Sequence, residues 1–304
     1  MKVSTNITFC FLIGLFAAPV FAQSEAIKAE NKAAVAAAEA ATQKGPRDIA
    51  IFDEATLSLP ADDVFIPAAG AARVFKSMGQ TLDEKRFVGV VASARDDSHW
   101  FALINFVRDG YVRDGDAQDW KADDLLRRLT DGTKQSNPSR KAHGAPALDV
   151  LGWAEPPTYD SKAHKLVWAV IAQRDDQPDD QAHHVVNYQT VALGRDGHLD
   201  LTIGSNLADL EADKSIATSL LQRVAFLPGK RYDDFNKLTD KVAAYGLAAL
   251  VVGVAAKKLG LLALLLAFLV KFAKLAAPIG VLVMWIKKKF RRSRAGGSGG
   301  IDMR

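Results

Sequence analysis

The chain has 304 residues, of which 49% are hydrophobic, 24% charged and 8% aromatic. This length and composition allow one large domain or two small ones, and they exclude collagen, a disulfide-stapled miniprotein and bulk disorder. The net charge of +4 arises from residues 241–304, which hold 12 Lys and Arg against one acid, so the acidic remainder lacks the cationic surface that nucleic-acid binding requires.

The first predicted element, residues 1–22, has the parts of a secretory signal peptide. Lys2 gives a positive start, residues 7–18 form a short apolar core, and small side chains precede a cleavage site after Ala22. An uncleaved N-terminal anchor is the alternative. Cys10, the only cysteine, lies inside this signal, so the mature chain would hold no thiol. That suits an oxidising compartment and excludes disulfides and cysteine-ligated zinc.

Residues 23–47 are predicted to be an Ala-rich helical spacer. Residues 24–44 are rich in Ala, Glu and Lys and lack a stripe of large apolar side chains, which favours a solvated helix. Gly45 and Pro46 end it. A helix that binds a partner is the alternative.

Residues 48–240 are predicted to form a folded α+β domain with a mostly antiparallel sheet. Apolar and β-branched runs predict its strands, and residues 198–203 alternate in the manner of a half-buried strand. The predicted strands are residues 86–94, 100–107 (central in the sheet), 164–172, 185–193 and 198–203. The predicted helices are residues 70–78, 121–129 and 207–224, the last with Asn206 as its N-cap.

Two Arg-Asp-Gly tripeptides are predicted to turn hairpins. They occupy residues 108–110 and 195–197, each between strand-like runs and each followed by a predicted helix. Asp-Gly is a strong signal for a tight hairpin. We therefore expect two β-hairpin–helix units.

The densest mixture of aromatic and ionisable side chains lies in residues 153–168. It comprises Trp153, Glu155, Tyr159, His164 and Trp168, and two prolines at 156 and 157 keep the backbone extended. One interpretation is a binding cleft for a sugar or peptide, in which Glu155 and His164 act as acid and base. The other is a turn between two core strands, with both tryptophans packed inside.

Two further polar clusters are candidate sites. His183 and His184 follow Asp179 and Asp180, but adjacent histidines on an extended chain point to opposite faces, so no metal site is predicted. Lys230, Arg231 and Tyr232 precede the apolar C-terminal stretch and either contact anionic headgroups or a partner, or form a solvated charged loop after a Pro-Gly turn. No nucleotide-binding or hydrolase motif occurs, so no cofactor is expected.

Residues 241–290 are predicted to be membrane-anchoring helices. Residues 242–286 are apolar except for four lysines, which makes them too long for one simple span of a bilayer core about 30 Å thick. We favour a span over residues 242–256 followed by an interfacial or re-entrant helix, and the alternative is a span over residues 259–286.

Basic residues set the expected orientation of this anchor. The membrane-flanking lysines are Lys257, Lys258, Lys271, Lys274, Lys287, Lys288 and Lys289. The last three belong to a basic cluster that marks the cytoplasmic side, followed by a flexible basic tail at residues 291–304. Residues 23–240 would then lie in the periplasm, outside the bacterial inner membrane.

Several stretches together resemble a known family. They are residues 57–60, 110–114 with Trp100, 152–160 (GWAEPPTYD), 164–168 (HKLVW), 228–235 (PGKRYDDF) and 240–246 (DKVAAYG). Over residues 50–286 the chain resembles DUF2167, a bacterial family of membrane-anchored proteins of unknown function. The resemblance implies a signal peptide, an envelope-exposed domain and a C-terminal anchor, and it implies no activity or catalytic residue.

These patterns predict a membrane-anchored cell-envelope protein that works as a non-enzymatic periplasmic binding module. The expected partners are inner-membrane lipid and either an envelope protein or further copies of the chain. The alternative is a membrane-bound periplasmic hydrolase that uses residues 153–168.

Overall fold

The structure is a computed structural model that describes residues 19–77, 82–95, 98, 100–142, 146–180 and 183–253. Most of the predicted signal peptide lies outside these residues. So do the basic tail and all seven predicted membrane-flanking lysines, from Lys257 to Lys289. The predictions for those segments therefore stay predictions.

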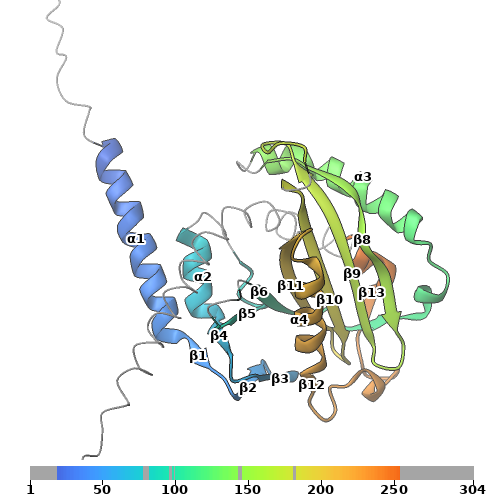
Figure 1. Ribbon diagram of the computed structural model, residues 1–304. Helices are drawn as coiled ribbons and strands as arrows, with labels where there is room; N and C mark the ends of the chain where they lie inside the picture. Colours follow the sequence, from blue (N-terminus) through green and yellow to red (C-terminus); the bar gives the residue numbers. More distant parts are fainter. Residues whose placement is uncertain are drawn as a thin grey trace, which may run out of the picture.

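The described chain folds as an α+β domain with an antiparallel main sheet (Figure 1). The helical elements are α1 (Pro19–Ala41), α2 (Ala68–Ser77), η1 (Gly115–Gln118), α3 (Ala122–Ala142), α4 (Leu210–Gln222), η3 (Tyr232–Asp234) and α5 (Leu247–Val251). The strands are β1 (Gln43–Lys44), β2 (Arg47–Ile51), β3 (Ala55–Leu59), β4 (Asp63–Pro67), β5 (Phe87–Ser93), β6 (Phe101–Val107), β7 (Tyr111–Arg113), β8 (Leu148–Asp160), β9 (Lys165–Arg174), β10 (Val185–Leu193), β11 (His198–Asn206), β12 (Val224–Phe226) and β13 (Val242–Gly246).

Three sheets make up the β structure. The main sheet has eight strands in the order β1-β4-β5-β6-β11-β10-β9-β8, and each neighbouring pair is antiparallel. A small antiparallel sheet has the order β12-β3-β2, and β7 pairs in parallel with β13. Strand β13, the last strand of the described chain, therefore lies outside the main sheet.

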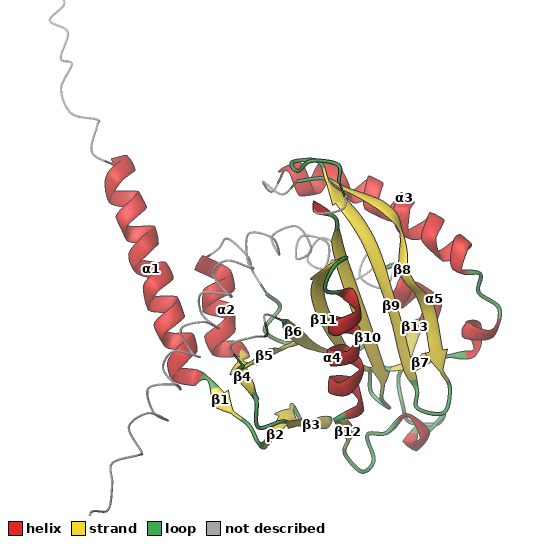
Figure 2. Ribbon diagram, viewed as in Figure 1, coloured by secondary structure: helices red, strands yellow, loops and turns green. Residues whose placement is uncertain are grey.

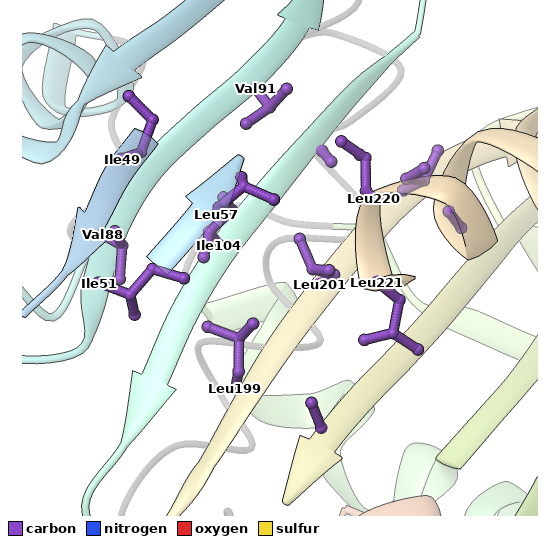
Figure 3. Close-up of a cluster of buried hydrophobic side chains, with 14 of the residues drawn as sticks. Ile49, Ile51, Leu57, Val88, Val91, Ile104, Leu199, Leu201, Leu220 and Leu221 are labelled. Atoms are coloured by element: carbon purple, nitrogen blue, oxygen red, sulfur yellow. The ribbon is translucent and has the colours of Figure 1, made fainter. Parts of the chain in front are cut away.

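One face of the main sheet packs against α4 and the small sheet. Figure 3 shows this core, where Ile51 and Leu57 of the small sheet and Leu220 of α4 meet Ile104 and Leu201 of the main sheet. All five side chains are buried. Burial of such aliphatic side chains is the main stabilising contribution to the fold.

The opposite face carries two separate cores. Over β4–β6 it is covered by α1 and α2, and over β8–β10 it is covered by α3, α5 and the β7–β13 pair (Figure 2). Alternate residues of β9 show the division, because Ala169 lies in the α4 core whereas Leu166 and Trp168 lie in the α3–α5 core. Between the two cores this face is polar, and Thr202 donates a hydrogen bond of 2.9 Å to Gln189.

The strand predictions for β5, β6, β9, β10 and β11 are confirmed in position, and β6 is central in the sheet as expected. The prediction that residues 198–203 are half-buried is wrong. His198 and Thr202 are buried as well as Leu199 and Leu201, so side chains on both faces of this strand are withdrawn from solvent.

Only the second Arg-Asp-Gly tripeptide turns a hairpin, between β10 and β11 and followed by α4. After Arg108-Asp109-Gly110 the chain leaves the main sheet, because β7 pairs with β13 instead of returning along β6. Gly110, with a φ of 99°, gives the backbone this change of direction. The expected first hairpin–helix unit is therefore wrong.

Two helix predictions need correction. The N-cap of α4 is Asp209 and not Asn206, because the helix begins at Leu210. The predicted spacer is helical, as α1 shows, but the prediction that this helix is solvated is wrong. Ala34 and Ala38 are fully buried against α2. Small side chains were enough to make this contact, so no stripe of large residues marked it.

The main sheet also begins at Gln43, ahead of the expected domain boundary at Asp48.

The expected membrane span over residues 242–256 is wrong over its described part. Residues 242–246 are strand β13, and the following helix α5 has five residues whose Leu247 and Val251 are buried in the domain. Among the described helices, none combines the length and the apolar character that crossing a bilayer requires.

Candidate functional site

The candidate site is centred on His164, at the end of the turn that joins β8 to β9. Asp160 Oδ1 accepts the backbone N–H groups of Lys162 and Ala163 and so closes the turn. His164 itself has a φ of 51°, in the left-handed region that a bulky residue seldom adopts. This backbone directs the imidazole toward η3.

Both ring nitrogens of His164 have partners on other elements. Nδ1 lies 3.3 Å from the hydroxyl of Tyr159, and Nε2 lies 3.2 Å from Asp233 Oδ1. Tyr159 donates its one hydroxyl proton to Asp114 Oδ2 at 2.8 Å. The two contacts therefore connect the imidazole to β8 through Tyr159 and to η3 through Asp233.

Four rings stack in a column that ends at this imidazole. Phe235 stacks on Tyr111 at 3.9 Å, Tyr111 on Tyr232 at 4.3 Å, and the His164 ring lies 4.2 Å from Tyr232. The rings come from β7, η3, the segment after η3 and the β8–β9 turn. Aromatic stacking of this kind adds to the energy of area burial. The column therefore joins segments that are far apart in the sequence.

The hydroxyls of Tyr232 and Tyr159 are committed to protein partners. Tyr232 donates to the carbonyl of Val112 at 2.8 Å inside the core. Burial raises the pKa of Tyr232, and burial together with the bond to Asp114 raises the pKa of Tyr159. Both hydroxyls therefore stay protonated donors rather than becoming phenolate nucleophiles.

The column is continuous with residues 227–241, which we call the strap because several elements hold it against the domain. Lys230 Nζ lies 2.7 Å from Asp196 and 3.5 Å from buried Glu54. The hydrogen bond that Lys230 donates to Asp196 raises the pKa of Lys230 and keeps it charged. Arg231 forms a β-bridge with Gly194. Lys230 is thus held by internal ion pairs, and the contact of residues 230–232 with headgroups or a partner stays a prediction.

A second ion pair holds the far end of the strap. Arg195 of the β10–β11 turn donates to both oxygens of Asp240, at 2.6 and 2.8 Å. Asp240 also accepts the backbone N–H of Asn236. The hydrogen bond from Arg195, followed by that from Asn236, holds the pKa of Asp240 far below its usual range. Bidentate pairs of this type fix orientation as well as charge.

The strap leads directly into β13 and α5, which are fixed to the domain in turn. Tyr245 donates to Asp109 at 2.7 Å. The carboxylate of Asp116 accepts the backbone N–H groups of Leu247 and Ala248, both at 3.0 Å, and so satisfies the free donors at the start of α5. The chain therefore enters its apolar C-terminal stretch from a rigidly held junction.

Of the other candidates in residues 153–168, Tyr159 contacts His164, whereas the remaining three have partners elsewhere. Trp168 is buried in the α3–α5 core, and Trp153 donates its indole N–H to the carbonyl of Ala122. Glu155 forms an ion pair of 2.8 Å with Lys214 of α4, on the opposite face of the sheet. Glu155 and His164 therefore do not form an acid–base pair.

Sequence reasoning missed several members of the site. Tyr111, Asp114, Phe235 and Asp240 had no motif of their own, and Asp233 lies in the stretch interpreted as a solvated charged loop. Their signal was indirect, since all five lie in the stretches that carry the family resemblance.

The acidic histidine segment forms two pairs rather than one cluster. His183 lies 2.7 Å from Asp180, and His184 lies 3.6 Å from Asp179. Nowhere in the described ranges do three or more His, Cys, Asp or Glu side chains gather as metal ligands would.

As a whole, the arrangement is suited to fastening rather than to bond-making. Its proton donors and acceptors are matched to one another, its rings are stacked on one another, and its ion pairs connect the strap to two turns. What the geometry provides is a stiff connection between the domain and the start of the C-terminal stretch.

Comparison with known proteins identifies a family but no function. No curated protein is similar enough to match the chain. Cyanobacterial PsbP (CyanoP) from Synechocystis sp. PCC 6803 is 9% identical, with 62% of this chain and 94% of that one covered at a TM-score of 0.36. The Saccharomyces cerevisiae Ran-binding protein Mog1p is 11% identical, with 64% and 100% covered at 0.33. Scores this low carry no argument. The model of the family described as "Protein of unknown function (DUF2167)" matches residues 43–281, so the chain belongs to the DUF2167 family.

Proposed function

We propose that this protein is a non-enzymatic interaction module of the bacterial cell envelope, tethered to the inner membrane by its C-terminal stretch. The domain would lie in the periplasm and the C-terminus in the cytoplasm. The observation that carries this proposal is the fastening of the strap and of α5, which gives the apolar stretch a stiff connection to the domain. A flexible linker would have sufficed if the anchor only had to retain the domain near the membrane.

The sequence after the described residues supports the tether. Residues 259–286 are long enough to cross a bilayer core of about 30 Å. They are followed by Lys287, Lys288 and Lys289 and then by further arginines, the pattern that marks a cytoplasmic flank. With the described part of residues 242–256 folded into the domain, residues 259–286 become the preferred span.

The separation of Glu155 from His164 removes the support for the hydrolase alternative. Acid–base catalysis requires both groups within hydrogen-bond reach of one reacting centre, and these two lie on opposite faces of the sheet. The hydroxyls of Tyr159 and Tyr232 are likewise occupied by Asp114 and a backbone carbonyl. We therefore assign these groups to the architecture of a binding module.

The orientation is tested first with reporters in cells that make the full chain. Alkaline phosphatase folds only outside the cytoplasm, and green fluorescent protein exported through the general secretory route does not fluoresce. We expect active phosphatase when it is inserted after Lys162, in the exposed β8–β9 turn, and fluorescence when the fluorescent protein follows Arg304. The reverse pattern would refute the tether as proposed.

The interaction role is tested by photo-crosslinking in the same cells. A benzophenone amino acid is placed at Leu151 or Phe52, two large apolar side chains that are 48% and 39% exposed. Lys162 is the matched exposed polar control. We expect a discrete adduct from at least one apolar site, to a second copy or to another envelope protein, and none from Lys162. Purified full chain that hydrolyses envelope substrates, with no adduct from either apolar site, would refute the proposal.

A further inference from the structure

The tip of the strap, residues 236–241, presents an apolar side chain between two lysines. We propose that this tip contacts the anionic surface of the bilayer, an inference that rests on the tether proposed above. Leu238 is 94% exposed, the highest value among the exposed large hydrophobic residues of the described chain. Lys237 precedes it and Lys241 follows three residues later, and both are exposed. Leu238 would enter the headgroup region while the two ammonium groups meet anionic headgroups.

The tip is held in shape by its own hydrogen bonds. Asn236 Oδ1 accepts the backbone N–H of Leu238, and the backbone N–H groups of Thr239 and Asp240 donate to the carbonyl of Asn236. Asp240 accepts from Asn236, from the Thr239 hydroxyl and from Arg195. Leu238 is therefore displayed by a closed turn, and little further ordering is required when it meets a surface.

The charges around the tip favour an anionic surface. Among the described residues, Lys237 and Lys241 form no ion pair, whereas the acid of the tip, Asp240, is neutralised by Arg195. Asp233 is turned toward His164, and Asp234 accepts the backbone N–H of Arg231. The free cations thus lie beside Leu238, and each lysine near an anionic leaflet contributes to attraction within a Debye length.

A bilayer suits this tip better than a protein does. The other exposed large hydrophobics, Phe52 and Leu151, lie on the β2–β3 turn and on β8, so the leucine is isolated rather than part of a broad apolar patch. A stable protein interface buries about 800 Å² on each partner around an apolar centre. Lipid chains accept one side chain without a shaped pocket. Only 20 residues lie between Leu238 and Leu259, so the contact is intramolecular once the anchor inserts.

The test uses the full chain with Cys10 replaced by serine and one new cysteine labelled with an environment-sensitive fluorophore. Leu238→Cys reports the tip, Lys162→Cys the exposed β8–β9 turn, and Leu262→Cys the apolar stretch itself. Each is reconstituted in vesicles of neutral phosphatidylcholine and in vesicles that also contain phosphatidylglycerol. We expect a blue-shifted, brighter label at 238 that grows with the fraction of phosphatidylglycerol, an aqueous label at 162, and an apolar label at 262 in both lipids.

Charge reversal provides the second arm. In Leu238→Cys carrying Lys237→Glu and Lys241→Glu, we expect the signal that depends on phosphatidylglycerol to fall by about half or more, because attraction becomes repulsion. An aqueous label at 238 beside an apolar one at 262 would overturn the surface contact and leave the tether intact. An aqueous label at 262 would refute the tether and the contact with it. An apolar label at 238 that rises with protein concentration in neutral vesicles would mean a protein partner, and would also overturn the proposal.

Discussion

At the residue scale, His164 adopts a backbone conformation that its side-chain contacts have to maintain. A φ of 51° costs a residue with a bulky side chain of order 1–3 kcal/mol. Tyr159, Asp233 and the ring of Tyr232 contact the imidazole from three directions. The strain is therefore offset by contacts that also join the β8–β9 turn to the strap.

Tyr159 is the member of this group that can be altered most conservatively. Tyr159→Phe keeps the ring but removes the hydroxyl that bridges Asp114 and His164. We expect the free energy of unfolding to fall by about 1–2 kcal/mol, because a partly buried carboxylate and an imidazole lose their shared partner. Urea unfolding of the full chain in detergent measures the change.

Thr158→Val is the control for this substitution. Its hydroxyl is exposed and bonds only to the carbonyl of Pro156 nearby, so we expect a change within about 0.5 kcal/mol. Equal stability of Tyr159→Phe and the parent chain would contradict the role given to the hydroxyl.

The stability of the folded state is expected to depend on pH through Asp63, at the start of β4. Burial raises its pKa to about 6, against the influence of Arg223. The folded state then binds this proton more tightly than the unfolded state, so stability falls as pH rises from about 4 to about 6. Asp63→Asn removes the ionisation. After allowance for partial solvent screening, we expect it to be about 1–2 kcal/mol more stable than the parent at pH 7.5.

The same comparison at low pH is the internal control for Asp63→Asn. At pH 4 the parent carboxyl is protonated when folded, so we expect the two chains to differ by about 0.5 kcal/mol or less. Urea midpoints at the two pH values measure both differences. A constant difference at pH 4 and 7.5 would mean that Asp63 does not titrate as described.

At the element scale, β8 shows how the long edge of the main sheet is protected. It is an edge strand with register irregularities at three places, and Pro156 and Pro157 lie in the last of them. Prolines and bulges interrupt the row of N–H groups that another strand would need for pairing. The Pro-Pro pair is therefore accommodated because this strand is at the edge.

The entry into α5 depends on a close approach between two elements. A Cβ on Gly246 would lie 2.6 Å from Asp116 Oδ2, so alanine there would displace the carboxylate from the N–H groups of Leu247 and Ala248. We expect Gly246→Ala to lower the free energy of unfolding by about 1–2 kcal/mol through loss of this cap. Thermal unfolding of the full chain measures it.

Gly132 in α3 is the matched control, because a Cβ there would meet nothing within 4 Å. Alanine favours a helix over glycine, so Gly132→Ala is expected to stabilise by up to about 1 kcal/mol. A lower free energy of unfolding for Gly246→Ala together with a higher one for Gly132→Ala would support the close approach at Gly246. A neutral Gly246→Ala would show that Asp116 can retain its bonds by shifting.

The elements that sequence predicted are those whose own side chains carry a strong pattern. Apolar runs located β5, β6, β9 and β10 because both faces of these strands are buried. β8 was missed because its bulges break the alternation of side chains and its prolines favour a turn. The apolar run of β13 instead predicts part of a membrane helix, since an apolar run alone does not distinguish a strand from a helix.

The candidate site was predicted in part, from residue types rather than from geometry. His164, Tyr159, Lys230 and Tyr232 were all singled out, but as two unrelated groups. The two groups come together in one site because of the left-handed backbone at His164 and the parallel pairing of β7 with β13. Neither feature can be recognised from the local spacing of residues. The partner acids Asp114 and Asp240 acquire a role only through those long-range contacts.

At the scale of the whole molecule, the strap is where separate parts of the fold converge. It contacts the β2–β3 turn through Glu54, the β10–β11 turn through Arg195 and Asp196, and the β8–β9 turn through His164. It then becomes β13 and α5. A force applied through the apolar C-terminal stretch would therefore be shared by several elements of the domain rather than taken up by one loop.

The pair of Arg195 and Asp240 tests whether this fastening is local. Asp240→Asn keeps the shape of the side chain but removes the charge that holds both guanidinium nitrogens. We expect hydrogen exchange of the amides in residues 228–241 and 242–246 to become several-fold faster, while β5 and β6 exchange as before. The control is Asp124→Asn, whose carboxylate pairs with Arg127 on the exposed surface of α3 and is expected to leave the strap unchanged. Unchanged exchange in the strap of Asp240→Asn would contradict the fastening. Equal acceleration in β5 and β6 would mean that the strap opens only when the whole domain unfolds, in which case the stiffness of the junction belongs to the fold and not to this ion pair.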